Sequence, residues 1–347
     1  MTTQTLSSVM VTSSLNKCLT SFFKKYRFQP IIHKRFKLFP HKKFRLKKLN
    51  SLQSGKEPPD RLYHYTSVNG MEGILTSRSL RASQIHFLND TQEFKYAVHI
   101  LREVVSELQK EYPITSIRKA LGPSPLLSKP EEFLAEFYWM IADTLLFDLF
   151  EKFPICVFSL SERGDLLSQW RGYCPLAGGY SIGFPSKLLI PFLQTRDLSI
   201  ASCVYDEKEQ QAIVRRTITE KGETLLKSLT DPSSEIDEIK KKCFVDFFME
   251  FSQIASILKH PSFYEEREWR IVSGHIESGR MLFRVGKSML IPYLSISFEG
   301  IEPFPIDKII IGPAPEQDLA KTSLFQFLLR NKLDISIETS KTPYRVL

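Results

Sequence analysis

The sequence has no long apolar run and few cysteines. A membrane-spanning helix needs about 18 or more apolar residues with few charges, and the nearest stretch, residues 140–150, is interrupted by Asp143 and Asp148. The five cysteines are odd in number, widely spaced and free of any CxxC pair, which argues against a disulfide framework and against a zinc site. We therefore expect no transmembrane segment, no bound metal, and a reducing, cytoplasmic location.

The common catalytic fingerprints are also absent. The chain contains no glycine-rich phosphate loop, no Walker lysine motif and no G-x-S-x-G elbow. The composition, 42% hydrophobic and 25% charged over 347 residues, is that of a soluble globular protein with a core to bury. A function must therefore be sought in residues that are far apart in the sequence.

Acidic residues are missing from the first 56 positions. These positions hold 13 of the 47 Lys and Arg residues and no Asp or Glu, so the remainder has 34 basic against 39 acidic residues. Aromatic residues such as Phe36, Phe39 and Phe44 lie among the basic ones. The pattern fits an arm that binds nucleic acid, a segment on an anionic membrane surface, a targeting segment or a flexible tail that keeps the protein soluble. We assign 1–59 to this tail and its linker, and 60–347 to a single folded domain.

The folded part alternates between strand and helix patterns. The residues Arg61–Ser67 favour a strand, and Ser67 is placed to cap the helix that follows. A long helix is expected over 130–153 and a helical insertion over about 206–260, after which short β segments dominate. The whole pattern predicts an α+β fold with a mixed, mainly antiparallel sheet.

A cluster of acidic residues stands directly before a strand pattern, in the stretch Phe263–Val272. Glu266 and Glu268 are therefore candidates for catalytic carboxylates, although short motifs of this kind often arise without function. An ordinary solvated strand has the same composition, with Arg267 and Arg270 pairing with the two glutamates for little gain in stability.

The order of several short motifs resembles that of the ADP-ribosyltransferase superfamily. That superfamily opens with a His-x-Thr or His-x-Ser strand before a helix and carries its catalytic glutamate in a Glu-aromatic-x-Ile/Val strand. The resemblance implies a split, mainly antiparallel sheet and NAD as the substrate. The segments that carry it are Tyr63–Thr66, Cys156–Ser159, Ser168–Tyr173, Gly179–Phe184 and Glu268–Val272.

The part of the chain from Leu62 to Arg345 is more closely similar to a bacterial family known as domain of unknown function 2971. This similarity implies no function. The residues that carry it are Tyr63–Thr66, Leu88–Asp90 with Glu93, Ser168–Tyr173, Glu266–Arg270, Ile309–Pro313 and Tyr344–Arg345.

The ADP-ribosyltransferase resemblance implies a catalytic role for Glu268. Its carboxylate would stabilise the oxocarbenium-like transition state in which the bond between nicotinamide and ribose breaks. His64 would bond the adenosine-side ribose and Thr66 would lie beside the nicotinamide amide. Because Glu266 is so close in the sequence, the choice between the two acids stays open on the motif alone.

Aromatic residues complete the implied NAD site. Trp170 or Tyr173 would stack on the nicotinamide ring. The middle strand contributes Phe158, where many members of the superfamily have Tyr, and Ser159. Each candidate also has an ordinary structural role, since His64 can simply be packed and Trp170 and Tyr173 can belong to the core.

The implied function is an NAD-dependent ADP-ribosyltransferase or an NAD glycohydrolase. Its target would be a macromolecule, a protein or a nucleic acid, and its setting a bacterial toxin or an anti-phage defence protein. The alternative is a non-catalytic nucleic-acid-binding module that uses the basic N-terminal tail, whose binding would depend steeply on salt.

These roles make geometric demands. His64 and Glu268 should lie in one sheet with their side chains opening on one pocket. Glu266 and Glu268 should share a face if the strand is already regular at position 266, and one of them should hold its proton more tightly than a free Glu. We assign the transition-state role to Glu268, deeper in the strand, and place Glu266 at the mouth of the pocket.

Overall fold

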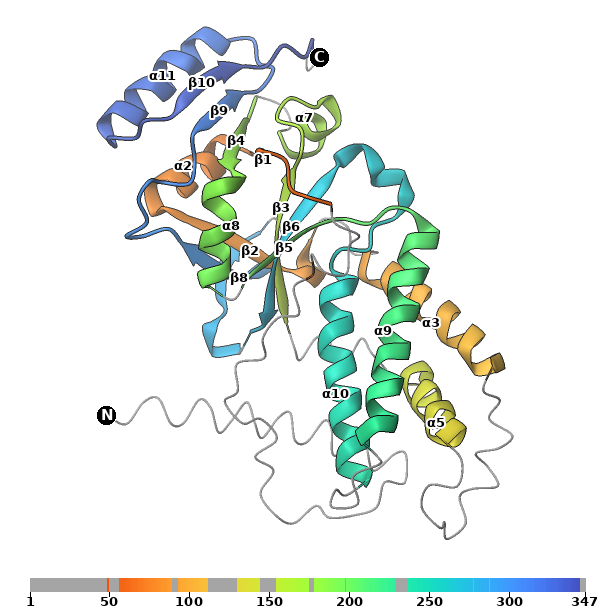
Figure 1. Ribbon diagram of the computed structural model, residues 1–347. Coiled ribbons are helices and arrows are strands. Elements are labelled where there is room, and N and C mark those ends of the chain that lie inside the picture. The colour runs from red at the N-terminus through yellow and green to blue at the C-terminus, as the bar shows by residue number, and fades with distance from the viewer. Residues whose placement is uncertain are drawn as a thin grey trace, which may run out of the picture.

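The computed structural model describes the folded part of the chain with several gaps (Figure 1). The basic tail, apart from Leu49, and also Asn89, Asp90 and Tyr344–Arg345 lie outside the described residues, so the predictions that concern them are not addressed by the structure. The described residues are 49, 56–88, 93–111, 130–143, 154–174, 178–196, 198–228, 236–276, 278–286 and 288–343.

One sheet of ten strands organises the described part of the chain (Figure 1). The strand order is β10-β9-β4-β1-β3-β2-β8-β7, with β6 paired to β3 and β5 paired to β6. All of these pairs are antiparallel except β9 with β10. The predicted α+β class with a mainly antiparallel sheet is therefore confirmed. The strands are β1 (Arg61–Thr66), β2 (Ser79–Gln84), β3 (Ile155–Ser161), β4 (Tyr180–Pro185), β5 (Ser199–Ser202), β6 (Glu268–His275), β7 (Leu282–Val285), β8 (Leu290–Ser297), β9 (Lys308–Ile311) and β10 (Ser336–Thr339).

The sheet branches at β3. This strand pairs with β6 from Ile155 to Ser161, with β2 at Val157 and Cys156, and with β1 only where Tyr63 faces Ser161. Three strands thus share β3 as a neighbour, and β1 and β2 leave it in different directions.

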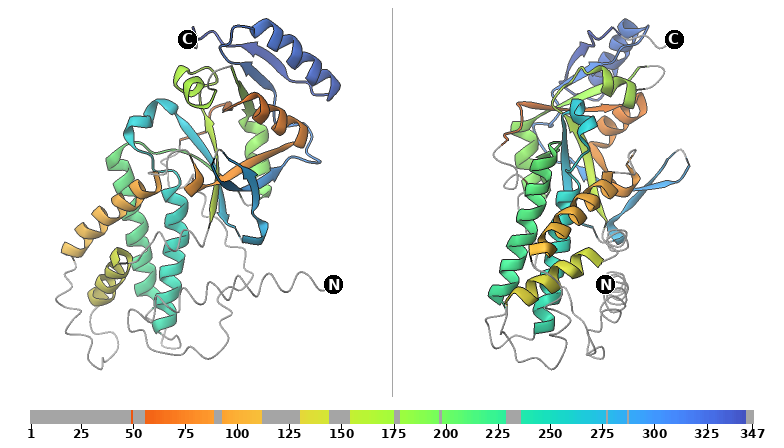
Figure 2. Two further views of the ribbon diagram at one scale, coloured as in Figure 1. Left: turned by 180° about the vertical axis from the view of Figure 1, so that it is seen from behind. Right: turned by 90° about the vertical axis from the view of Figure 1, so that its right-hand side faces the viewer.

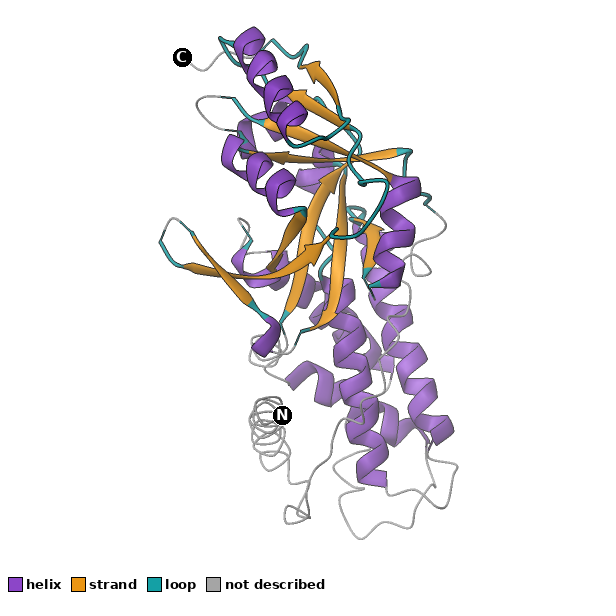
Figure 3. Cartoon of the chain, turned by 90° about the vertical axis from the view of Figure 1, so that its left-hand side faces the viewer, coloured by secondary structure: helices purple, strands orange, loops and turns teal. Residues whose placement is uncertain are grey.

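Helices cover both faces of the branched sheet (Figures 1, 2 and 3). Because side chains alternate along a strand, Ile155 and Val157 of β3 pack with α3, α5, α9 and α10, while Cys156, Phe158 and Leu160 pack with α2, α8 and α11. The helices are α2 (Val68–Ser77), α3 (Glu93–Glu111), α5 (Pro130–Asp143), α7 (Leu167–Tyr173), α8 (Ser186–Thr195), α9 (Glu207–Ser228), α10 (Ile236–Ala255) and α11 (Gln317–Arg330), with 3-10 turns η2 (Ile85–Phe87), η3 (Pro261–Glu266) and η4 (Ser278–Arg280).

Local sequence signals explain several of these elements. The Ser67 side chain accepts a hydrogen bond of 3.2 Å from the Gly70 N–H, as expected of a helix N-cap. α9 and α10 lie within the predicted helical insertion, and α5 starts where the long helix was expected, although residues 144–153 are outside the described ranges. None of the helices in the described ranges has the length and apolar character needed to span a membrane.

Candidate functional site: a buried charge cluster around Glu268

Glu266 and Glu268 meet at one cation although they do not belong to one regular strand. Glu266 ends the turn η3, Arg267 adopts a left-handed conformation with φ of 43°, and β6 begins only at Glu268. The condition for strand alternation, a regular strand at position 266, is therefore not met, because the turn η3 occupies that position. Both carboxylates nevertheless bond the ammonium group of Lys259, so they converge by way of the turn.

Glu268 is held by two basic side chains. Its Oε2 accepts a hydrogen bond of 2.6 Å from Lys259 Nζ and one of 2.9 Å from Arg270 Nη2, and its Oε1 accepts one of 2.8 Å from Arg270 Nε. Only 5% of Glu268 and 2% of Arg270 is exposed. Arg270 thus pairs with Glu268, as in the ordinary interpretation of this stretch, but inside the protein and not at its surface.

The same network joins the sheet to the helices. Arg270 Nη2 lies 2.7 Å from an oxygen of Glu93, the first residue of α3, and Arg270 Nη1 donates to the Ser256 carbonyl just after α10. Lys259 also lies 3.4 Å from Glu93. We call the set Glu93, Lys259, Glu266, Glu268 and Arg270 the Glu268 cluster.

The cluster moves the pKa values of its two neighbouring glutamates apart. Burial alone would raise the pKa of Glu268, but the charges of Arg270 and Lys259 outweigh it and lower the pKa to about 2. Burial raises the pKa of Glu266 above its usual value, and the charge of Glu268 adds to the increase while Lys259 opposes it. Glu268 is therefore firmly ionised, and Glu266 holds its proton more tightly than a free Glu.

Two further polar side chains contact Glu268, and a third lies within the field of its charge. Tyr205 Oη accepts a hydrogen bond of 2.9 Å from the Glu268 backbone N–H, and the Cys203 thiol lies 3.7 Å from Glu268 Oε2. Burial raises the pKa of Tyr173, and the charges of Glu268 and Glu266 raise it further, which places its phenol within their field. Tyr173 is 36% exposed, so part of its side chain is accessible from the surface.

The comparison with known proteins finds one family over this region. Residues 169–271 match the model of a family described as a protein of unknown function, DUF2971. This part of the chain, which is less than half of its length, is similar to that family. No curated protein and no solved structure matches the chain.

The DUF2971 match contains most of the cluster. Tyr173, Lys259, Glu266, Glu268 and Arg270 all fall within it. Glu93 and the motif at Tyr63–Thr66 lie before it, and Ile309–Pro313 lies after it. The similarity to DUF2971 thus covers the segment that supplies most of the Glu268 cluster.

His64 lies near this DUF2971 segment in the sheet but on the other face. Tyr63, Ser161 and Glu268 form a row across three strands, which places β1 about 10 Å from β6. The His64 ring lies against the Phe158 ring, with centroids 4.2 Å apart. Ser159 and Ser161 of β3 share the face of Glu268, so Phe158, which alternates with them along the strand, lies on the opposite face. His64 and Glu268 therefore share the sheet, as predicted, but do not open on one pocket, because the register puts them on opposite faces.

The backbone branch explains the position of His64. His64 Nδ1 donates a hydrogen bond of 2.9 Å to the Ser159 carbonyl. Because β1 diverges from β3 after the pair Tyr63 and Ser161, the backbone of β1 does not bond this carbonyl. Burial outweighs the hydrogen bond to Ser159 and lowers the pKa of His64 to about 4, so the ring is neutral near pH 7. His64 thus acts in this structure as a packed residue at the branch.

Trp170 and Thr66 have structural partners as well. Trp170 is 1% exposed, packs edge-on against Tyr65 and donates a hydrogen bond of 2.7 Å from Nε1 to Asp165. Its ring fills the space that a side chain at Gly312 would need. The Thr66 hydroxyl lies over Gly70 in the first turn of α2, and its carbonyl accepts from Cys174 Sγ. Of the predicted NAD contacts, two lie at the Glu268 cluster: Ser159 pairs with Arg270 across β3 and β6, and Tyr173 lies within the field of the two glutamates.

Lys259 and the role of Glu93 were not predicted. Lys259 follows α10 without any motif, and Glu93 is adequately explained in the sequence as a helix-capping residue. The clue available in the sequence is the high charge density of 265–270, which cannot by itself reveal a partner 177 positions away, as Glu93 is from Arg270.

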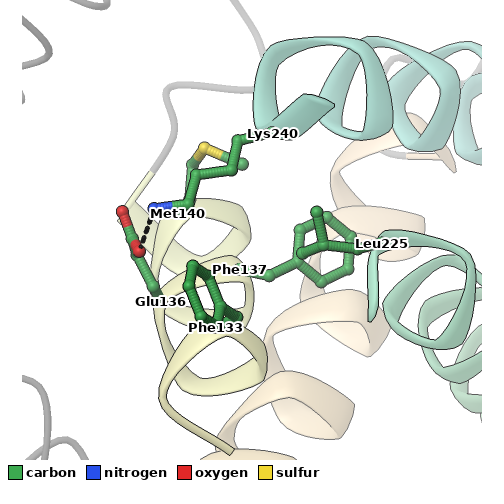
Figure 4. Close-up of a pocket in the computed structure, with 6 residues that line it drawn as sticks. All are labelled: Phe133, Glu136, Phe137, Met140, Leu225 and Lys240. Atoms are coloured by element: carbon green, nitrogen blue, oxygen red, sulfur yellow. Dashed lines mark hydrogen bonds and ion pairs between the residues drawn. The ribbon is translucent and has the colours of Figure 1, made fainter. Parts of the chain in front are cut away.

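A separate ion pair lies between the helices α5 and α10 (Figure 4). A small hollow between α5, α9 and α10 contains the ion pair of Lys240 and Glu136, with 2.6 Å between Nζ and Oε2, among apolar side chains. None of the residues selected from the sequence lines it. Among the described residues, no group of three or more His, Cys, Asp or Glu side chains is arranged to hold a metal ion.

Proposed function

We propose that this protein cleaves the bond between nicotinamide and ribose in NAD and transfers the ADP-ribose to a protein or nucleic acid, or to water. The observation that carries the proposal is the pair Glu266 and Glu268, whose pKa values are driven in opposite directions around one lysine. Neighbouring acids with separated pKa values are a common basis for dividing two catalytic roles.

The ionised member suits charge stabilisation. As the glycosidic bond breaks, its electron pair leaves with neutral nicotinamide and positive charge develops on the ribose. A carboxylate already ionised and fixed by Lys259 and Arg270 stabilises that charge without having to reorganise. Glu268 takes this role in the proposal, although it is only 5% exposed and Glu266 is the more accessible of the two acids.

The second acid suits proton transfer. A new bond forms between the ribose carbon and an acceptor hydroxyl, amine or water, and the proton of that acceptor must be removed. A carboxylate with a raised pKa is a better base at neutral pH than a free Glu, and the Glu266 side chain is 20% exposed, so an acceptor can reach it. The partly exposed Tyr173 ring supplies a surface on which nicotinamide can stack.

The proposal extends to the setting of the activity. We place the protein in the cytoplasm, and the buried free thiols of Cys156, Cys174, Cys203 and Cys243 support a reducing compartment. The ADP-ribosyltransferase resemblance supports a toxin or an anti-phage defence protein. His64 and Phe158 lie across the sheet, so this reaction scheme does not use them.

The test is an assay with NAD that is labelled in both the nicotinamide and the ADP-ribose parts. The wild-type protein should release nicotinamide and label an acceptor when cell extract protein or nucleic acid is added. Glu266→Gln should lose acceptor labelling by a larger factor than nicotinamide release, because water competes for the ribose when the acceptor keeps its proton. If neither NAD binding nor nicotinamide release occurs with any acceptor, the proposal fails.

A further inference from the structure

A hairpin projects from one end of the sheet. β7 and β8 extend away from the body in two views (right panel of Figure 2, and Figure 3). β8 pairs with β2 along the part nearer the body, whereas β7 pairs with β8 and is the last strand in the sheet order. The outer edge of β7 therefore has no strand beside it in the described part of the chain.

The hairpin carries exposed apolar side chains at its free end. Val285 is 85% exposed, and Phe283, Met289 and Leu290 are each more than half exposed. Phe283 pairs with Pro292 and Val285 with Leu290, so Phe283, Val285 and Leu290 lie on one face of the hairpin. An exposed apolar group of this size on a projecting element marks an interaction surface.

The charged residues of the hairpin segment are all basic. Between Ser278 and Phe298 the sequence contains Arg280, Arg284 and Lys287 but no Asp or Glu. Arg81 of β2 adds a cation near the base of the hairpin, where its guanidinium lies 5.6 Å from the centre of the Tyr293 ring. The partner of this surface must therefore combine apolar and anionic groups.

We propose that the hairpin inserts its apolar end into the interface of an anionic lipid bilayer while its basic side chains contact the headgroups. A second copy paired along β7 would bring Arg280 and Arg284 of both chains together without any acid between them, which is unfavourable. A nucleic acid offers stacked bases, for which proteins use aromatic side chains, whereas Phe283 is the single aromatic residue among the four exposed apolar side chains, and Val285, the most exposed of them, is aliphatic. Acyl chains below a layer of anionic headgroups match both properties.

The test uses the full chain with vesicles of phosphatidylcholine alone or mixed with phosphatidylglycerol. Val285→Trp places a fluorescent reporter at the end of the hairpin, and Leu329→Trp places one at an exposed apolar position of α11 as the matched control. Anionic vesicles should shift the emission of Val285→Trp to shorter wavelength, and brominated lipids should quench it. Leu329→Trp should show neither effect.

Binding strength provides the second measurement. Val285→Ser combined with Leu290→Ser should weaken binding to anionic vesicles roughly tenfold or more at high salt, where the basic N-terminal tail is screened. The variants are checked for an unchanged melting temperature and elution volume. Binding that is absent, or that is equal in wild type and variant, would overturn the proposal. So would a change from dimer to monomer in the variant, which would assign the hairpin to a second copy.

Discussion

The charge state of a single carboxylate depends here on a few close neighbours. Lys259 and Arg270 keep Glu268 ionised in spite of its burial, and the charge of Glu268 adds to the effect of burial in raising the pKa of Glu266. Two glutamates that were both exposed to water would have nearly the same pKa. The separation of the two acids is thus a property of the cluster and not of either residue.

His64 provides a pH-dependent prediction. Its pKa is lowered from 6.5 to about 4 in the folded protein, so the unfolded chain takes up the proton first as the pH falls. The free energy of unfolding should be largest above about pH 6.5, and wild type should lose about 3 kcal/mol from this residue by pH 4. His64→Asn keeps a donor near the Ser159 carbonyl and removes the titration.

The measurement is urea unfolding of wild type and His64→Asn between pH 4 and 7. The stability difference between the two proteins should shift in favour of the variant as the pH falls. Parallel curves would show that His64 is accessible to protons in the folded state.

Many elements can be predicted from local pattern alone. The strand at 61–66 with its capped helix, the two helices of the insertion and the strands after 267 all follow from periodicity and capping residues. α8 was not predicted because Pro191 lies inside it. β2 was not predicted either, since its position is fixed by pairing with β8, more than 200 residues away.

The site was harder to predict than the fold. Glu266, Glu268 and Tyr173 can be picked out from the sequence because a charged strand start and an aromatic helix leave local signals, and the structure brings the two glutamates together at Lys259. Lys259 and Glu93 reach the cluster only through tertiary packing. The face of His64 depends on where β1 leaves β3, and no motif encodes that register.

At the level of elements, Arg270 should act as the connection between β6, α3 and the end of α10. Arg270→Met removes a cation from a site with three carboxylates and should lower the free energy of unfolding by about 3–5 kcal/mol. Hydrogen exchange should accelerate in the first turn of α3 and around Ser256.

The matched control is Arg215→Met. Arg215 also bonds two glutamates, Glu107 and Glu111 of α3, but all three side chains are solvent-exposed. Its loss should cost about 1 kcal/mol or less. Equal losses of unfolding free energy in the two variants would mean that burial does not increase the contribution of the Glu268 cluster to stability.

For the whole molecule, the distribution of charge separates a basic N-terminal part from a mildly acidic remainder. The first 56 residues carry all of the excess positive charge, while the rest has a net charge of −5. The nucleic-acid-binding alternative concerns the tail and stays a prediction, since those residues lie outside the described ranges. The catalytic proposal concerns the folded domain, so a substitution at the Glu268 cluster tests it without altering the tail.

The most direct test is the rate of nicotinamide release by Glu268→Gln, measured beside NAD affinity. The control is Glu93→Gln, which changes the same buried network at a residue to which we assign no chemical step. Its melting temperature shows how much of any loss comes from the network. We expect Glu268→Gln to abolish turnover with little change in NAD affinity, as for an interaction made in the transition state, and Glu93→Gln to keep NAD affinity and turnover within about tenfold of wild type. Turnover retained by Glu268→Gln, or lost equally in Glu93→Gln, would contradict a catalytic role for Glu268.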